Sequence, residues 1–341
     1  MTEKDFWRKS TIAVIGGGNW GTVLAQLAAE NCAEVRMWVR EEEQARTINS
    51  TRVNPGYAQT MQLSPKLRAI SDPERVFEGG NVQAVIWALP SGVCREMARK
   101  LAPVFRGNEV ILHATKGIEE GSLKRISQIL REELPCARIG VISGPNLADE
   151  VARGNPAATV VASHFREVVS AGQALLTTEK FRVYAAEDVV GVEWAGTLKN
   201  VLAIAAGALD ALKLGWNTRA MLMTRGLAEM VRFGVAMGAE PATFLGLAGV
   251  GDLLATCSSP LSRNYQVGVA LAQGRKLSEI VGEVGSTVEG VRTTAHVRAF
   301  AKQRSIYMPI TEAVFLLLEG KVSVEQVMHE LMVRPPMTEQ A

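Results

Sequence analysis

The feature that most constrains this chain is a glycine-rich turn between an apolar strand and a helix near the N-terminus. The run Gly16-Gly17-Gly18-Asn19-Trp20-Gly21 contains the pattern G-x-G-x-x-G, with TIAVI before it and TVLAQLAAE after it. Glycines permit a sharp turn and the close approach of a pyrophosphate, and the helix N-terminus offers unpaired N–H groups. A turn without a ligand is the alternative, but motif, strand and helix together favour a dinucleotide-binding unit.

The position after the second strand, which usually binds the ribose of NAD through an acid, is basic here. The segment EVRMWVR ends at Arg40, about 20 residues past Gly21. A guanidinium can bind the 2′-phosphate of NADP or stack on adenine. Because Glu41, Glu42 and Glu43 follow and can still reach a ribose, we expect NADPH to be preferred and NAD to be tolerated. A solvated arginine at the strand end is the alternative.

Short β-branched runs alternate with helical segments through the first half of the chain. We predict strands over 11–16, 34–40, 84–89, 109–115, 138–143, 157–162 and 181–185, and helices over 20–30, 92–102 and 122–133. Continuous apolar strands separated by helices are typical of a parallel sheet covered on both faces. The predicted fold class is therefore α/β, with an N-terminal doubly wound parallel sheet of the Rossmann type.

From about Glu187 the strand signal fades and helical periodicity replaces it. Helices are predicted over 193–213, 217–238, 264–273, 289–303, 309–319 and 323–332. We place the domain boundary near residue 190. Residues 1–190 would form an NAD(P)-binding domain, and residues 191–341 an all-α domain for substrate binding and catalysis.

Composition and charge argue against several other classes of protein. Lys and Arg total 37 against 35 acids, a formal net charge of +2, so no broad basic surface for nucleic acid is indicated. The four cysteines and four histidines show no metal-ligand spacing, so no metal is expected. The N-terminus MTEKDFWRKS lacks an apolar signal region, and the longest apolar stretch, 201–209, is too short to span a bilayer. We expect a cytoplasmic protein without membrane insertion.

Two lysines occupy positions that are unusual for solvated surface residues. Lys116 follows the strand EVILHAT, at the carboxyl edge of the predicted sheet, where ligands bind in open α/β folds. Lys199 lies on a predicted helix, and its neighbours at helical spacing are the small residues Ala195, Gly196 and Ala203. Such a face lets a ligand or another backbone approach the ammonium. A solvated lysine is the alternative reading of each position.

Around these lysines the chain resembles the NAD(P)-dependent glycerol-3-phosphate dehydrogenases, especially the bacterial ones. The matching blocks run in family order from about residue 12 to 290: Gly16–Gly21, Ala114–Glu119, Ser143-Gly144-Pro145, Gly196–Ala203 with Asn217, Gly251-Asp252-Leu253 and Ser262-Arg263-Asn264. The chain departs from the pattern at Asn19, where serine is common, at Asn146, where a small hydroxyl residue is common, and at Ala211, where glycine is usual. Asn19 can still donate a hydrogen bond to phosphate.

The resemblance implies reversible reduction of dihydroxyacetone phosphate to sn-glycerol 3-phosphate for glycerophospholipid synthesis, by a homodimer that uses NADP or NAD. Lys199 matches the family's proton-transfer residue. The substrate-binding positions match Lys116, Gly144, Asn146, Lys199, Asp252, Ser262, Arg263 and Asn264. The expected cofactor-binding set is Gly16, Gly18, Asn19, Trp20, Gly21 and Arg40, to which the resemblance adds Lys116, Ala148, Arg263, Thr287 and Glu289.

In the role that the resemblance implies, Lys199 must exchange a proton near neutral pH. A free lysine has a pKa of about 10.4, which is too high for efficient exchange. Burial or a second cation lowers the pKa of an amine, and Lys116 and Arg263 are the candidates for that cation. A neighbouring carboxylate has the opposite effect. We therefore expect Asp252 to position Lys199 or a substrate hydroxyl rather than to activate the amine.

The substrate phosphate needs a binding site of its own. Ser262 is predicted to cap the helix that follows it, so that the helix N-terminus, Arg263 and the Asn264 amide converge on an anion. A capped helix start without a ligand is the alternative. Asn200 is a further candidate, because its amide can bind the substrate or orient Lys199, although a purely structural role is equally compatible. Trp20 is expected to pack beside the glycine turn.

Two other functions remain open. One is a related two-domain reductase acting on a hydroxy acid or ketopantoate, and the other is a dinucleotide-sensing module without catalysis. The Ser262-Arg263-Asn264 cluster favours a phosphorylated substrate over the first alternative.

Overall fold

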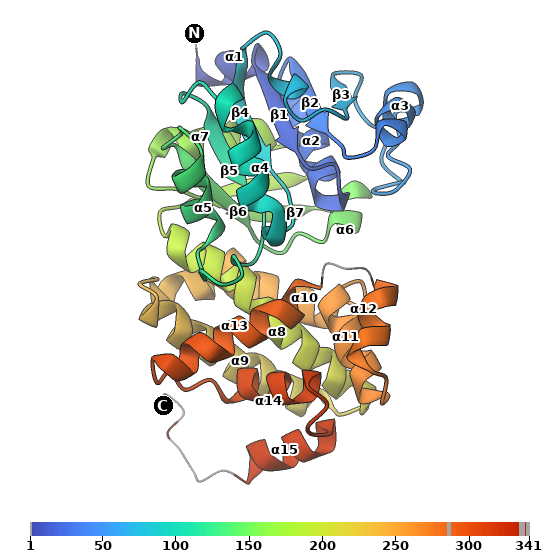
Figure 1. Ribbon diagram of the computed structural model, residues 1–341, viewed down its shortest axis with the longest axis vertical. Coiled ribbons are helices and arrows are strands. Elements are labelled where there is room, and N and C mark those ends of the chain that lie inside the picture. Colours follow the sequence, from blue (N-terminus) through green and yellow to red (C-terminus); the bar gives the residue numbers. More distant parts are fainter. Residues whose placement is uncertain (1, 285–287, 334–337, 339–341) are drawn as a thin grey trace. The chain divides into compact units, whose positions relative to one another are not determined.

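The computed structural model describes residues 2–284, 288–333 and 338. These residues fall into two compact units, one ending at Val189 and one beginning at Val190 (Figure 1). The first unit contains a β-sheet with flanking helices, and every regular element described in the second is a helix. The predicted α/β fold class, a Rossmann-type sheet domain and an all-α domain, is confirmed.

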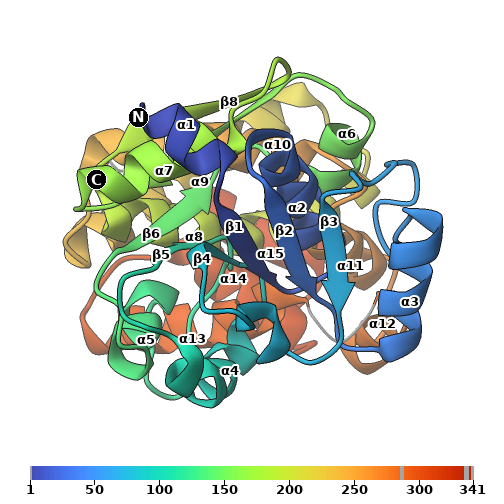
Figure 2. The same ribbon diagram turned by 90° about the horizontal axis from the view of Figure 1, so that it is seen from above.

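The described strands of the first unit form one sheet in the order β3-β2-β1-β4-β5-β6-β7-β8. They are β1 Thr11–Ile15, β2 Glu34–Trp38, β3 Leu67–Ile70, β4 Val82–Trp87, β5 Val110–His113, β6 Ile139–Ser143, β7 Ala157–Ala162 and β8 Phe181–Ala186. The helices of this unit are α1 Glu3–Arg8, α2 Asn19–Asn31, α3 Glu42–Thr51, α4 Cys94–Leu101, α5 Ile126–Glu133, α6 Ala148–Ala152 and α7 Arg166–Leu176. Figure 2 shows β1, β2 and β3 side by side.

One pair of strands departs from the predicted parallel arrangement. Strand β7 is antiparallel to β6 and parallel to β8, whereas the other described pairs are parallel. The connection between β6 and β7 contains only the five-residue helix α6. At about 1.5 Å per residue, such a helix is too short to carry the chain back along a strand, so the chain reverses instead.

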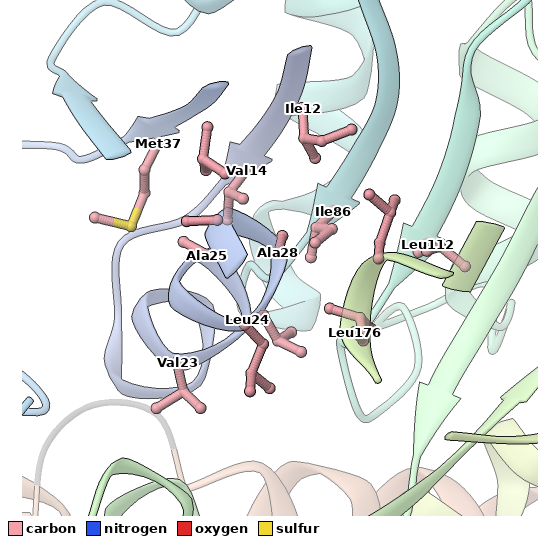
Figure 3. Packing of buried hydrophobic residues seen from close by; sticks show 14 of the residues in the cluster. Ile12, Val14, Val23, Leu24, Ala25, Ala28, Met37, Ile86, Leu112 and Leu176 are labelled. Atoms are coloured by element: carbon pink, nitrogen blue, oxygen red, sulfur yellow. The ribbon is translucent and has the colours of Figure 1, made fainter. Parts of the chain in front are cut away.

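The sheet is buried on both faces because side chains alternate along each strand. Ile12 and Val14 of β1 pack with residues of α2 and α7, whereas Ala13 and Ile15 pack on the opposite face with residues of α4 and α5. Figure 3 shows residues of the first of these two cores. Burial on both faces explains why the strands read as continuous apolar runs in the sequence.

The boundary between the units falls at the start of the long apolar helix α8, Val189–Ala211, which belongs to the second unit from Val190 onward. It is followed by α9 Trp216–Ala236, α10 Asp252–Ser258, α11 Arg263–Ala272, α12 Leu277–Val284, α13 Glu289–Gln303, α14 Pro309–Leu318 and α15 Val324–Met332. Within the described residues, only α8 is long and apolar enough to cross a membrane, and 89% of its most apolar window is buried. It therefore has the character of a core helix.

Helices α8 and α11 touch backbone to backbone. A Cβ atom at Gly268 of α11 would lie 1.9 Å from the carbonyl oxygen of Ile204, and one at Gly207 of α8 would lie 2.0 Å from the carbonyl oxygen of Tyr265. Only glycine fits at either position. The small residues of α8 thus admit another backbone, and this contact fixes the N-terminus of α11 beside α8.

A buried carboxyl group holds the start of α14. Glu229 of α9 is 3% exposed and accepts hydrogen bonds from the backbone N–H groups of Ile310 and Thr311 and from the Thr311 hydroxyl. These donors satisfy the carboxyl group and at the same time pair the first N–H groups of α14. Burial nevertheless raises the pKa of Glu229 from 4.5 to about 7.

We expect this group to make the stability of the second unit depend on pH. Because the folded state raises the pKa of Glu229, its contribution is fully present below pH 4.5 and is lost as the pH rises through about 7. The expected loss is about 2.5 kcal/mol between about pH 5 and pH 8. Urea unfolding of wild type and Glu229→Gln at both pH values should show the wild type losing this much relative to the variant. Glu330→Gln, at an exposed position of α15, is the control. An unchanged difference would contradict the assignment.

Candidate active site

The glycine turn joins the end of β1 to the start of α2. Gly16 has φ +121°, and a Cβ there would lie 2.4 Å from the carbonyl oxygen of Ala88. A Cβ at Gly21 would lie 1.9 Å from the carbonyl oxygen of Gly16. At Gly18, the N-cap of α2, the space around a Cβ position is open to 4 Å. Side chains at these glycine positions would fill the space around the turn. The bare backbone and the helix N-terminus therefore fit a dinucleotide pyrophosphate.

Asn19 and Trp20 connect the turn to the rest of the first unit. Asn19 donates from Nδ2 to Oδ1 of Asp149 over 2.8 Å and accepts from the N–H of Ala58 over 2.9 Å. One N–H of its amide is thus used by Asp149, and the predicted phosphate contact would have to use the other. Trp20 is partly buried, with its ring centroid 6.2 Å from that of Phe181, which is the packing role expected of it.

Arg40 lies beyond the end of β2, which stops at Trp38, two residues short of the predicted strand. Its side chain is 85% exposed, and its Nε donates to Oε1 of Glu41 over 2.8 Å. A pair this exposed contributes little to stability. The guanidinium is therefore available to a ligand at the carboxyl end of β2.

The other predicted residues of the first unit follow two adjacent parallel strands. Half-buried Lys116 follows β5. The turn that contains Gly144 and Asn146 follows β6, the neighbouring strand, and leads to Ala148, the first residue of α6. Asn146 donates from Nδ2 to the carbonyl oxygen of Ala158 over 2.9 Å, which fixes the turn against β7. Carboxyl ends of parallel strands share an edge of the sheet, so the fold brings Lys116 and this turn to the edge where ligands bind.

In the second unit, Lys199 is buried within a polar cluster. Its Nζ lies 2.6 Å from Oδ1 of Asp252 and 2.6 Å from the hydroxyl of Thr256, which itself donates to Asp252 over 3.2 Å. The residues are 6%, 2% and 5% exposed, respectively. Asp252 is thus placed to position the lysine, as the sequence predicts. Thr256 was not predicted, although its spacing of four residues from Asp252 on one helix face was the available signal.

Cys257 lies next to this cluster on α10. Burial raises the pKa of its thiol to about 12, although the positive charge of Lys199 acts in the other direction. The thiol therefore stays protonated near neutral pH and supplies no thiolate as nucleophile or base. Cys257 is therefore not a candidate for acid–base chemistry in this cluster.

The start of α11 has the cap that the sequence predicts. The Ser262 hydroxyl accepts a hydrogen bond from the N–H of Tyr265 over 3.4 Å. Arg263 is exposed, and its side chain forms no hydrogen bond or ion pair with the described residues. A capped helix N-terminus with an available guanidinium fits a phosphate group.

Asn264 lies at the centre of a short hydrogen-bond chain. Its Nδ2 donates to Oδ1 of Asn200 over 3.0 Å, and its Oδ1 accepts from the N–H of Gly290 over 3.0 Å. This chain ties the starts of α11 and α13 to α8. These two bonds use one N–H donor and the oxygen of the Asn264 amide. They do not test a direct contact of Asn264 with the substrate phosphate, which stays a prediction.

The remaining predicted residues are at the start of α13. Glu289 is its partly buried first residue, whereas Thr287 lies outside the described residues. Across the parts of the chain that the structure describes, no group of three or more His, Cys, Asp or Glu side chains could hold a metal ion.

Comparisons with known proteins show which family the chain resembles over most of its length. Residues 11–169 match the family model described as NAD-dependent glycerol-3-phosphate dehydrogenase N-terminus, and residues 188–329 match the corresponding C-terminus model. A glycerol-3-phosphate dehydrogenase [NAD(P)+] from Pseudomonas fluorescens is 48% identical over 96% of this chain and 92% of its own length. The crystal structure of glycerol-3-phosphate dehydrogenase from Coxiella burnetii superposes with a TM-score of 0.89 at 36% identity, covering 96% of this chain and 99% of that one.

Sequence identity and TM-score give less support to the reductase alternative. A ketopantoate reductase from Ralstonia eutropha superposes with a TM-score of 0.59 at 16% identity, over 94% of this chain and 100% of that one, which shows a shared fold alone. The two family models together cover most of the chain, and the relatives match it almost end to end. The chain belongs to the NAD-dependent glycerol-3-phosphate dehydrogenase family.

Proposed function

We propose that this chain catalyses the reversible NAD(P)H-dependent reduction of dihydroxyacetone phosphate to sn-glycerol 3-phosphate, the backbone precursor of glycerophospholipids. The observation that carries the proposal is the buried Lys199 ammonium held by Asp252 and Thr256, on a helix that packs beside the capped start of α11. This arrangement supplies a positioned proton donor and an anion site within one unit. Family membership supports the choice of substrate and cofactor.

Residues 1–190 are assigned to the cofactor. The bare backbone at Gly18 and the start of α2 would bind the pyrophosphate, and Arg40 would bind the 2′-phosphate of NADPH. When bound, the nicotinamide ring supplies a hydride to the carbonyl carbon of the substrate. Lys116, Ala148, Arg263, Thr287 and Glu289 complete the proposed cofactor contacts.

Residues 191–341 are assigned to substrate binding and proton transfer. In reduction, the Lys199 ammonium donates one proton to the carbonyl oxygen, so that carbonyl, hydride and proton become a secondary alcohol. In oxidation, the neutral amine accepts that proton back. Asp252 and Thr256 fix the position of Nζ, and the Asp252 carboxylate stabilises the charged form of the lysine.

The phosphate of the substrate is assigned to the start of α11. The free N–H groups of the first helical turn, the guanidinium of Arg263 and the cap Ser262 form the site, and Asn264 is the fourth proposed member. Lys116, Gly144 and Asn146 are the substrate-binding residues proposed from the first unit. No metal is part of this proposal.

A single assay tests the proposed function. Purified protein should oxidise NADPH when dihydroxyacetone phosphate is added, and should reduce NADP when sn-glycerol 3-phosphate is added. Ketopantoate and unphosphorylated dihydroxyacetone are the comparison substrates, and both should react far more slowly. Turnover of ketopantoate instead would support the reductase alternative. Binding of NADPH without turnover of any substrate would support the sensing module.

The preference for NADPH depends on Arg40 in this proposal. Arg40→Gln is expected to lower the ratio of kcat/KM for NADPH over NADH by about 10- to 100-fold, because a charge-assisted bond to the 2′-phosphate is worth about 1.5–3 kcal/mol. Arg46→Gln is the matched control, since it removes an exposed arginine of α3 that pairs with Glu42. If the two variants change the ratio of kcat/KM equally, Arg40 does not bind the 2′-phosphate.

Two further expectations belong to this proposal. We propose a cytoplasmic homodimer, which is supported by the resemblance to the family and by the apolar helical half of the chain. Light scattering on the purified protein should give twice the mass of one chain, and the mass of a single chain would contradict the dimer. Recovery of the protein in a washed membrane fraction would contradict the cytoplasmic assignment.

A further inference from the structure

The loop that carries Lys116 is held by an ion pair from a neighbouring connection of the sheet. Glu119 lies three residues after Lys116, and Arg95 lies in the first turn of α4, after β4. The Arg95 guanidinium binds the Glu119 carboxylate through two parallel hydrogen bonds, Nε to Oε1 over 2.5 Å and Nη2 to Oε2 over 2.8 Å. This bidentate geometry fixes direction as well as distance.

The loop around Glu119 is also ordered by its own backbone. The N–H of Glu119 donates to the carbonyl oxygen of Lys124 over 2.9 Å, and its carbonyl oxygen accepts from the N–H of Leu123 over 3.0 Å. Ile118 forms an isolated β-bridge with Arg125. The segment after Lys116 is therefore a closed turn, and Arg95 anchors it from outside the turn.

Most exposed ion pairs contribute little to stability, but the pair between Arg95 and Glu119 differs from them in burial and geometry. The Arg95 and Glu119 side chains are only 21% and 20% exposed. Hydrogen bonding to Arg95 lowers the pKa of Glu119 from 4.5 to about 2, so the carboxylate is fully charged near neutral pH. Arg95 also binds Glu132 over 3.0 Å and Glu133, both on α5. The guanidinium thus links α4 and α5 to the loop.

We propose that Arg95 is a positioning residue for Lys116: by clamping Glu119, it fixes the loop that presents this lysine at the carboxyl edge of the sheet. The inference rests on the proposed function, in which Lys116 contacts substrate and cofactor. Arg95 itself contacts neither in this proposal. A small displacement of a group that orients the substrate can cost about 100-fold in rate.

The same network contains a matched control. Arg99, one turn along α4, binds Glu133 through Nε over 2.9 Å and through Nη2 over 3.1 Å, so it too joins α4 to α5. Among the hydrogen bonds and ion pairs of the described residues, Arg99 has none to the loop that carries Lys116. If the network had only a structural role, variants of Arg95 and Arg99 would have similar activities.

The test compares Arg95→Gln, Arg95→Lys, Glu119→Gln and Arg99→Gln with wild type. Arg95→Gln should lower kcat/KM for dihydroxyacetone phosphate by about tenfold or more, mainly through KM, whereas Arg99→Gln should stay within about twofold of wild type. Arg95→Lys should recover part of the loss, because it keeps the charge but not the bidentate geometry. Hydrogen exchange of the 114–121 amides should quicken in Arg95→Gln and not in Arg99→Gln.

A double variant isolates the proposed contact. The double variant Arg95→Gln/Glu119→Gln should have a kcat/KM no lower than that of the less active single variant, since both substitutions break the same bond. Multiplied effects would overturn the proposal, as would kinetics and exchange in Arg95→Gln that match those of Arg99→Gln. A wild type that fails to reduce dihydroxyacetone phosphate would instead refute the proposed function and, with it, the role of Lys116.

Discussion

Lys199→Met is expected to lower kcat for reduction of dihydroxyacetone phosphate by about a thousandfold while leaving NADPH binding in place. Methionine keeps much of the side-chain volume but has neither a proton to give nor a charge. General acid–base catalysis typically contributes about 10²–10⁴-fold, and the ammonium also binds the substrate oxygen. Stopped-flow measurement of NADPH oxidation gives the rate, and quenching of protein fluorescence gives the NADPH affinity.

The Lys199→Met variant also breaks the buried ion pair with Asp252, and this loss of stability has to be separated from the loss of chemistry. Breaking a buried ion pair by removing one partner costs about 3–5 kcal/mol. Lys199→Met/Asp252→Asn also removes the charge of Asp252, so it should regain most of the lost Tm and none of the activity. Recovery of more than about a tenth of wild-type kcat would contradict the assignment of Lys199 as proton donor.

Arg263→Ala is expected to raise KM for dihydroxyacetone phosphate by about 100-fold. A charge-assisted, forked contact with phosphate is worth about 1.5–3 kcal/mol per bond, and about 2.7 kcal/mol corresponds to 100-fold in affinity. Arg263 is exposed and has no hydrogen-bond or ion-pair partner among the described residues, so its removal should leave Tm nearly unchanged. Initial rates over a range of substrate concentrations measure the effect.

The control for Arg263 uses both a second residue and a second substrate. Gln273→Ala truncates an exposed residue at the C-terminal end of α11 and should leave KM within about twofold of wild type. For unphosphorylated dihydroxyacetone, Arg263→Ala and wild type should react at the same low rate, because the missing contact is to the phosphate. Equal KM values for dihydroxyacetone phosphate in Arg263→Ala and wild type would favour a substrate without a phosphate.

The sequence predicts those strands whose two faces are both buried. TIAVI and AVIWAL are continuous apolar runs because each side chain packs against one of two helical layers. The strand β3 was not predicted, because two of its four residues are at least partly exposed and it forms no apolar run. The reversal between β6 and β7 was also missed, since an apolar run carries no information about strand direction.

Local chemistry in the candidate site was predictable, and long-range pairing was not. The Ser262 cap follows from residues within one helical turn, and the Gly16–Gly21 turn follows from its flanking strand and helix. The bond between Asn200 and Asn264, and the clamp between Arg95 and Glu119, join residues far apart in the sequence. Each of these side chains alone is compatible with a solvated surface, and only the packing of the helices and loops brings the partners together.

The most direct test of the account is a crystal structure of the protein with NADP and sn-glycerol 3-phosphate bound together. The account predicts Nζ of Lys199 within hydrogen-bond distance, about 3 Å, of the C2 hydroxyl oxygen, with the substrate phosphate at the start of α11 beside Arg263. A C2 hydroxyl bonded to a different acid–base group, with Nζ of Lys199 beyond hydrogen-bond distance of the substrate, would contradict it.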